Sequence, residues 1–223
     1  MKTILVNFNS RHHTWLLYNL LLSFEKNTAH PERVTICINI DSDDEESDRF
    51  SHFAQDNIKL NLIFNKEERI PALNERLNRS FRNYMCDFNW ALNADTCVMT
   101  KNWDLVLDEF DDSPMAYYID DDGPYGDGKR YCFFPILSKK ILSAMKNFFP
   151  PTIQNLGADV CLHNILSDFP IIKHIPIKVL HYKYNGMMPE WIYFDRSYFN
   201  NALYLDGDEL KMMQGRIKSV VTS

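Results

Sequence analysis

The first ninety residues alternate between short apolar runs and helical stretches, and this alternation constrains the fold more than any other feature. The strand-like runs are residues 3–8, 34–40, 58–65 and 88–93, and the helical patterns are 14–27 and 70–85. Strands that are separated by helices return to the sheet in the same direction, because a parallel connection needs a long crossover. The sequence therefore predicts an α/β fold with a mostly parallel central sheet flanked by helices.

The second half of the chain is less regular but continues the same kinds of element. Helical patterns occupy residues 103–110, 139–149 and 157–169, and strand-like stretches occupy 113–120, 131–138 and 171–184. Pro176 is expected to break the last of these strands, because proline cannot donate to a sheet ladder. With 223 residues, no internal repeat and no long low-complexity linker, the sequence predicts one domain over residues 1–223.

Charge and cysteine usage disfavour some kinds of partner and of cysteine chemistry. The chain has 24 basic and 30 acidic residues and no lysine- or arginine-rich run, which disfavours a nucleic-acid backbone as the main partner. The five cysteines form no CxxC pair, so reduced thiols in the cytoplasm are favoured over disulfides. The apolar run at residues 4–6 is too short for the core of a signal peptide. No run of about 18 apolar residues occurs, so no membrane span is expected.

Polar side chains stand at the ends of three predicted strands. Asn9 follows the first, Asp41 follows the second, and Asn93 and Asp95 follow the strand that begins at Phe88. Ligands of parallel sheets gather at the carboxyl ends of the strands, and residues two apart on a strand share one side. A carboxylate there can hold Mg²⁺ or Mn²⁺ against a pyrophosphate. The alternative is an ordinary strand-terminal turn, and residues 43–48 are interpreted as a solvated acidic loop.

The order and spacing of several short segments resemble the GT-A glycosyltransferases, in particular the small single-domain, family 2-like type. The matching segments are Asn78-Arg79-Ser80, Cys86-Asp87, residues 88–92 and Asn93-Ala94-Asp95. The chain departs from that pattern where Ser80 and Cys86 replace glycines and where Asn93 replaces the first Asp of Asp-x-Asp. The resemblance implies a nucleotide-binding half at residues 1–110 and an acceptor-binding half with a C-terminal extension at 111–223.

The resemblance also implies a set of functional residues. The nucleotide-sugar contacts that it implies are Asn9, Asp41, Arg76, Asn78, Asn93 and Asp95. A divalent metal, Mn²⁺ or Mg²⁺, would be coordinated by Asp95 and His181. His174 is the second choice for the coordinating histidine. Asp159, near a predicted helix start, would be the catalytic base of an inverting reaction, and the alternative is that it only caps its helix. His163 lies four residues further on the same helix face.

The function implied is transfer of a sugar from a nucleotide-diphosphate sugar, most simply a UDP-sugar, to a hydroxyl of a glycan, a protein or a modified DNA base. A degenerate domain that binds a sugar nucleotide or a partner without turnover is the alternative. The sequence lacks GxGxxG after the first strand and lacks GxxxxGKS/T, which disfavours dinucleotide oxidoreductases and phosphate-loop NTPases. Residues 120–129 are a candidate lid over the donor. The candidate acceptor-groove aromatics are Trp191, Tyr193, Phe194, Tyr198, Phe199 and Tyr204.

Overall fold

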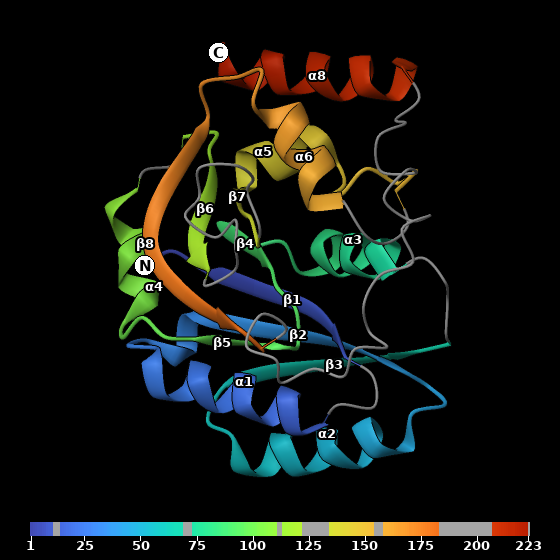
Figure 1. Ribbon diagram of the computed structural model, residues 1–223, viewed down its shortest axis with the longest axis vertical. Helices are drawn as coiled ribbons and strands as arrows, with labels where there is room; N and C mark the ends of the chain where they lie inside the picture. Colours follow the sequence, from blue (N-terminus) through green and yellow to red (C-terminus); the bar gives the residue numbers. More distant parts are fainter. Residues whose placement is uncertain are drawn as a thin grey trace.

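Eight strands form one mixed sheet in the order β3-β2-β1-β4-β7-β6-β8-β5 (Figure 1). The computed structural model describes residues 1–10, 14–68, 73–110, 113–121, 134–153, 158–182 and 207–222. The strands are β1 (Ile4–Ser10), β2 (Val34–Asp41), β3 (Asn61–Glu67), β4 (Phe88–Ala91), β5 (Thr96–Val98), β6 (Ala116–Asp121), β7 (Ile136–Ser138) and β8 (Ile172–His181). The helices are α1 (Thr14–Asn27), α2 (Glu45–Asn57), α3 (Leu73–Tyr84), α4 (Trp103–Val106), α5 (Lys139–Met145), α6 (Ala158–Leu166) and α8 (Gly207–Val221), with 3₁₀ turns at Pro31–Arg33 and Leu107–Glu109.

The sheet is parallel in its first half and mixed in its second. Strands β3, β2, β1 and β4 run parallel to one another, as the helix-separated pattern predicts. Beyond β4 the β4–β7, β7–β6 and β8–β5 pairs are antiparallel, and β6–β8 is parallel. Among the strands that the structure describes, the second half therefore supplies one of the four parallel pairs.

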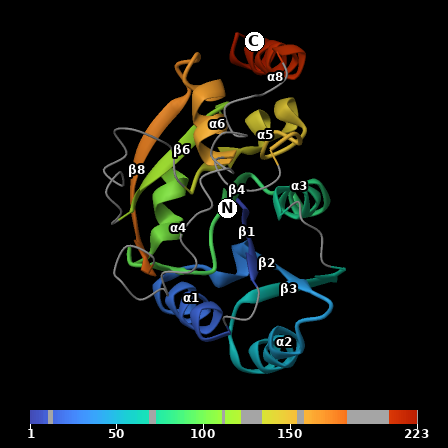
Figure 2. The same cartoon turned by 45° about the vertical axis from the view of Figure 1, so that its right-hand side comes forward.

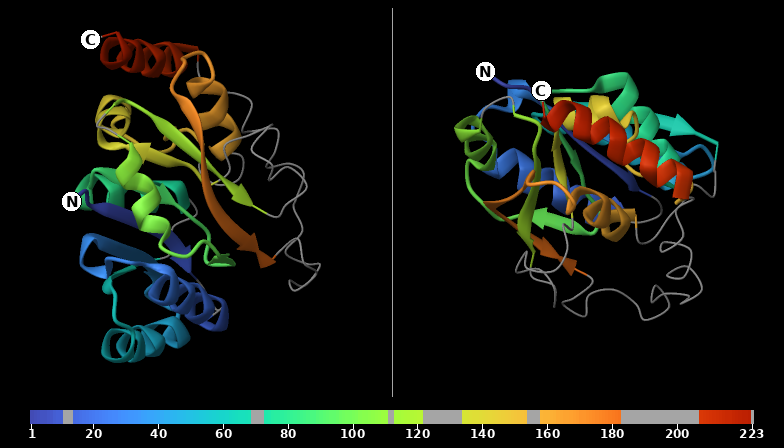
Figure 3. Two further views of the ribbon diagram at one scale, coloured as in Figure 1. Left: turned by 90° about the vertical axis from the view of Figure 1, so that its left-hand side faces the viewer. Right: turned by 90° about the horizontal axis from the view of Figure 1, so that it is seen from above.

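Alternation along the strands gives each face of the sheet its own apolar core. On β1, Ile4, Val6 and Phe8 belong to the core that α1, α2 and α4 cover, whereas Leu5 faces the core under α3, α5, α6 and α8. Figures 1 and 2 show α1 and α2 on one side of the parallel strands and α3, α5 and α6 on the other. Figure 3 shows α8 at the end of the molecule opposite α2.

The acidic run at residues 43–48 begins a helix, so its interpretation as a solvated loop is wrong. Asp44 is the N-cap of α2, is completely buried, and accepts hydrogen bonds from the backbone N and the hydroxyl of Ser47 at 3.2 and 2.7 Å. Glu45, Glu46 and Asp48 lie in the first turn, where the helix dipole stabilises negative charge. The acids therefore start the helix that packs beside β2 and β3.

The predicted break at Pro176 is also wrong, because β8 is continuous from Ile172 to His181. Its pairing with β6 shifts register between the pairs Tyr118–His174 and Asp120–Lys178, on either side of the proline. A proline has no backbone N–H to donate, so an irregularity in the ladder is the place where a strand tolerates it. This continuity carries His181 to the end of β5.

A row of buried amides joins the parallel strands to α3. The Asn39 Nδ2 donates to Asn7 Oδ1 at 3.0 Å, and Asn39 Oδ1 accepts from Asn65 and from the Ser80 hydroxyl at 3.1 and 2.8 Å. Asn7 Nδ2 in turn donates to the Leu77 carbonyl at 3.1 Å. These bonds fix the position of α3 over β1, β2 and β3.

Replacing Asn39 by alanine is expected to lower the free energy of unfolding by about 2–3 kcal/mol, because buried partners on three elements lose their hydrogen bonds. Urea denaturation measures the change. The matched control is Asn57→Ala at the exposed end of α2, where one bond to the Phe53 carbonyl is lost and the expected change is below about 0.5 kcal/mol. Equal decreases in the free energy of unfolding of the two variants would contradict a special role for the row of buried amides.

The four described cysteines, Cys37, Cys86, Cys97 and Cys161, are free thiols. Burial raises the pKa of the Cys37 thiol to about 11, so this thiol is protonated at neutral pH. None of the described helices has the length and apolar character needed to cross a membrane.

Candidate functional site

The carboxyl ends of β2, β1 and β4 lie side by side and bring the predicted nucleotide residues to one edge of the sheet. In the pairing register Ser10 lies beside Ile40, one residue before Asp41, and Asn7 lies beside Ala91, the last residue of β4. The strand ends that carry Asn9 and Asp41 therefore adjoin the segment that follows β4. This is the edge at which parallel α/β sheets bind their ligands.

A buried ion pair occupies the β2 end of this edge. Asp41 Oδ1 lies 2.5 Å from Arg76 Nη1, and both side chains are buried. Arg76 belongs to α3 and also donates to the Glu68 carbonyl at 2.6 Å. Two charges removed from water are stabilised only by close pairing, so the guanidinium holds the carboxylate in one orientation.

Next to this pair, two polar atoms at the end of β1 are buried without a partner among the described residues. They are Asn9 Oδ1 and Ser10 Oγ. Asn9 uses its Nδ2 to donate to the Leu73 carbonyl at 3.2 Å, which leaves the oxygen as an available acceptor. Buried polar groups are normally hydrogen-bonded, so ordered water or a bound polar ligand would complete the hydrogen bonds of these two atoms. The sequence pattern did not single out Ser10.

The Asn78 amide is held by the protein itself. Its side chain is completely buried, donates to the Phe149 carbonyl at 3.0 Å and accepts from the Phe149 backbone N at 2.9 Å. Both ends of the amide therefore join α3 to the segment after α5. Arg76, half a turn earlier on the same helix, likewise contacts the protein through its pair with Asp41.

The predicted metal pair is brought together by the β5–β8 ladder. Thr96 of β5 pairs with His181 of β8, and the Tyr182 backbone N donates to the Asp95 carbonyl at 3.0 Å. His181 Nε2 consequently lies 3.2 Å from Asp95 Oδ2, with both side chains largely buried. His174, the second choice for this position, instead contacts Asp120 at 2.7 Å with its side chain partly exposed.

Asp159 and Asn93 line a common cavity of about 130 Å³. Asp159 lies in the first turn of α6, and its Oδ1 accepts a hydrogen bond from the Val160 backbone N at 2.9 Å. His163, on the same helix, is half-buried, and burial lowers the pKa of its imidazole. The predicted base and one predicted donor-binding residue thus share a small, partly apolar space. The other lining residues are Asn74, Leu77, Ala91, Leu92, Phe134, Pro135, Phe149 and Ala158.

Asn93 and Asp95 do not share a strand. Strand β4 ends at Ala91, and the following residues form a turn that leads into β5. Strand alternation therefore does not place their side chains on one side. Asn93 lines the cavity with Asp159, whereas Asp95 contacts His181.

The donor atoms of Asp95 and His181 suit a divalent cation whose other coordination positions are filled by a bound molecule and water. They provide one carboxylate and one imidazole, both of which Mn²⁺ accepts. Within the described residues, no cluster of three or more His, Cys, Asp or Glu side chains could hold a metal by itself. The remaining coordination positions would fall to diphosphate oxygens and water, as is common for Mg²⁺ at phosphate sites.

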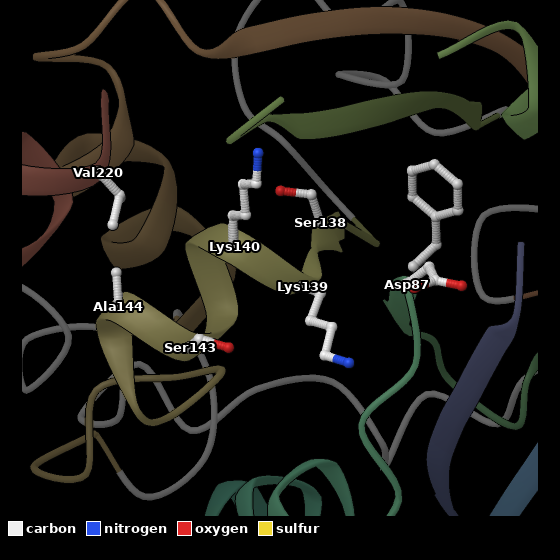
Figure 4. Close-up of a pocket in the computed structure, with 8 residues that line it drawn as sticks. Asp87, Ser138, Lys139, Lys140, Ser143, Ala144 and Val220 are labelled. Atoms are coloured by element: carbon white, nitrogen blue, oxygen red, sulfur yellow. The ribbon is translucent and has the colours of Figure 1, made fainter. Parts of the chain in front are cut away.

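A larger cavity, of about 530 Å³, lies at the opposite edge of the sheet. Figure 4 shows the Lys139 and Lys140 amines, which lie on its wall, pointing away from each other. Asp87 is already held by the backbone N and hydroxyl of Thr3, at 2.8 and 2.9 Å. The polar groups of this cavity do not converge on one point, so we place the functional site at the carboxyl edge. The lining residues are Asp87, Phe88, Ser138, Lys139, Lys140, Ser143, Ala144 and Val220.

Solved glycosyltransferase structures share this architecture over nearly the whole chain. A structure of S. aureus TarS in complex with UDP matches 98% of this chain and 69% of its own, with a TM-score of 0.67 and 11% identity. The Pyrobaculum calidifontis mannosyltransferase PcManGT, in complex with GDP-Man and Mn²⁺, matches 96% of this chain and 68% of its own, with a TM-score of 0.64 and 12% identity. The chain has the GT-A glycosyltransferase fold.

The GT-A fold is shared although the sequences have diverged widely. GalNAc-T7 with UDP, GalNAc and Mn²⁺ matches 95% of this chain and 50% of its own, with a TM-score of 0.63 and 13% identity. The chain spans only 43% of the longer TarS chain. The sequence matches no protein-family model and no curated protein. The GT-A fold is therefore visible in the arrangement of elements and not in overall sequence similarity.

Part of the predicted GT-A site lies outside the described residues. Residues 122–129 of the candidate lid are among these, whereas Asp120 and Asp121 end β6. The candidate acceptor aromatics, Trp191, Tyr193, Phe194, Tyr198, Phe199 and Tyr204, also lie outside them.

Proposed function

We propose that this chain transfers a sugar from a nucleotide-diphosphate sugar to a hydroxyl acceptor. The observation that carries the proposal is the presence of three groups at one edge of a GT-A sheet. These groups are the Asp41–Arg76 pair, the Asp95–His181 pair and the cavity shared by Asn93 and Asp159. The Asp41–Arg76 pair would provide polar contacts for a nucleoside. The Asp95–His181 pair would coordinate a metal bound to the diphosphate, and Asp159 would be a base beside the acceptor.

The nucleotide-binding half, residues 1–110, would hold the donor. Asn9 Oδ1 and Ser10 Oγ offer hydrogen-bonding atoms beside Asp41, which suits a ribose or a base. The bound UDP of TarS supports a UDP-sugar as the first donor to test, and the GDP-Man of PcManGT supports a GDP-sugar as the second. We leave Asn78 out of the direct contacts because both ends of its amide bind Phe149.

Asp95 and His181 would hold a divalent metal at the diphosphate. When bound, such a metal neutralises the charge that develops on the leaving diphosphate. Asn93 adds a neutral amide from the same turn, which can hydrogen-bond a sugar hydroxyl without adding charge. The metal-bound structures of PcManGT and GalNAc-T7 support testing Mn²⁺ first.

Asp159 would accept the proton of the acceptor hydroxyl as that oxygen attacks the sugar carbon. The first turn of α6 stabilises its carboxylate form, which keeps Asp159 deprotonated and available but only weakly basic. Attack from the side opposite the leaving diphosphate inverts the configuration at that carbon. The acceptor-binding half, residues 111–223, would select a glycan, a protein or a modified DNA base.

The proposal is tested by incubating the purified chain with UDP- and GDP-sugars, with and without Mn²⁺, across these three acceptor classes. Release of nucleoside diphosphate together with a glycosylated product is the expected result. Tight binding of a sugar nucleotide without product in any combination would instead support a binding domain without turnover. NMR of the new glycosidic linkage reports whether the configuration is inverted.

Asp159→Asn is expected to lower kcat roughly 100-fold or more while UDP affinity stays the same, because the amide cannot accept the acceptor proton. Steady-state kinetics and calorimetry with UDP measure the two effects. The matched control is Asp168→Asn just beyond α6, an exposed carboxylate that accepts a hydrogen bond from Gln214. Turnover close to wild type in Asp159→Asn would remove Asp159 as the base.

A further inference from the structure

Phe134 has an unusual backbone conformation for an aromatic residue. Its φ is 48°, in the left-handed region, which costs an L-residue roughly 1–2 kcal/mol. Asn102 and Lys146 are the other described non-glycine residues with positive φ. Asparagine tolerates this region, and Lys146 is the C-cap of α5, a common place for it. Phe134 has neither explanation, so its conformation must be imposed by its surroundings.

Two hydrogen bonds to β4 hold the backbone at this point. Trp90 Nε1 donates to the Phe134 carbonyl at 3.0 Å, and the Ala91 backbone N donates to the Pro135 carbonyl at 3.2 Å. Trp90 is completely buried and is itself fixed by ring contacts with other aromatic side chains of the core. The backbone of Phe134 is therefore anchored to a tightly packed part of the fold.

Phe134 contacts two of the three groups of the proposed active site, His181 and the cavity. Its ring meets the His181 imidazole edge to face, with centroids 5.2 Å apart and planes at 76°. The residue also lines the cavity that contains Asn93 and Asp159, and it is only 8% exposed. An edge-to-face contact restricts how the imidazole can turn, and His181 Nε2 is 3.2 Å from Asp95 Oδ2.

We propose that Phe134 is a positioning residue whose ring holds the His181 imidazole with Nε2 toward Asp95. The left-handed backbone brings that ring against His181 while Trp90 holds the carbonyl. The inference rests on the proposed function, because it gives Phe134 a role through the Asp95–His181 metal site. Glycine would adopt this backbone freely but would leave the imidazole without its contact.

The test compares Mn²⁺ affinity, measured by calorimetry with Mn²⁺ alone and with Mn²⁺ plus UDP, in the wild type and three variants. Phe134→Leu keeps an apolar side chain, and Phe134→Gly relieves the backbone. Both are expected to weaken Mn²⁺ binding about 10-fold or more, the range seen when groups that orient a ligand are lost. Lys146→Gly is the matched control, since it relieves the same backbone conformation at an exposed position and should leave Mn²⁺ affinity unchanged.

Thermal melting and UDP binding without metal are measured on the same samples, because a merely structural role for Phe134 would lower stability and spare metal affinity. Wild-type Mn²⁺ affinity in folded Phe134→Leu would overturn the inference and leave the proposed function intact. A wild-type protein that binds no Mn²⁺, even with UDP, would overturn the metal role itself and this inference with it.

Discussion

Asp95→Ala is expected to lower turnover of the nucleotide sugar about 1000-fold in the presence of Mn²⁺, because metal stabilisation of a developing charge contributes several kcal/mol. The variant loses the carboxylate that would anchor the metal. A rise of about 4 kcal/mol in the activation free energy corresponds to a factor of about 1000 in rate. Release of nucleoside diphosphate under saturating Mn²⁺ measures the effect.

Two further variants separate the metal role of Asp95 from its structural contacts. Asp95→Asn keeps the shape of the side chain and the backbone bond to Tyr182 but removes the negative charge, so it should also be strongly impaired. Asp56→Ala, an exposed carboxylate on α2, should keep full turnover. Undiminished turnover in Asp95→Ala, with melting that shows a folded protein, would refute the assigned role.

Asp104→Ala is expected to lower the free energy of unfolding by about 3–5 kcal/mol, the largest loss of stability among the variants. Asp104 is completely buried and accepts hydrogen bonds from the backbone N of Ala29 and His30 at 2.8 and 3.1 Å and from Arg33 Nε at 3.1 Å. Removing it leaves the buried Arg33 guanidinium and two backbone N–H groups without this carboxylate. The expected change in Tm is a fall of roughly 10–15 °C for a chain of this size.

Asp108→Ala is the matched control because Asp108 binds the same arginine from a partly exposed position. Arg33 Nη1 lies 2.5 Å from Asp108 Oδ1, whose side chain is 42% exposed. Exposed partners contribute little, so the expected cost is below about 1 kcal/mol. Urea denaturation of both variants gives the comparison, and an Asp104→Ala protein as stable as Asp108→Ala would contradict the buried-network account.

Local sequence patterns predicted the parallel half of the fold well. Strands β1, β2, β3 and β4 and helices α1 and α3 occur near their predicted positions, because alternation and helical periodicity are properties of neighbouring residues. Strand β5 has only three residues and forms against β8, which lies far along the chain. A local pattern cannot predict such a strand, and the same holds for the continuity of β8 through Pro176.

In the candidate site too, the sequence pointed to some residues, whereas contacts between distant segments determine the position of others. The resemblance to GT-A glycosyltransferases pointed to Asp95 and His181, which the structure places 3.2 Å apart. It also pointed to Asn78, whose amide the fold uses to bind Phe149. No sequence signal pointed to Phe134, because its backbone is held by a tertiary hydrogen bond from Trp90.

The most direct measurement is the anomalous diffraction of Mn²⁺ in crystals of the chain grown with UDP. If Asp95 and His181 hold the metal, one strong peak lies within about 2–2.5 Å of Asp95 Oδ2 or His181 Nε2, with diphosphate density beside it. A bound UDP in the cavity between Asp87 and Val220, or a Mn²⁺ peak remote from both side chains, would contradict this assignment.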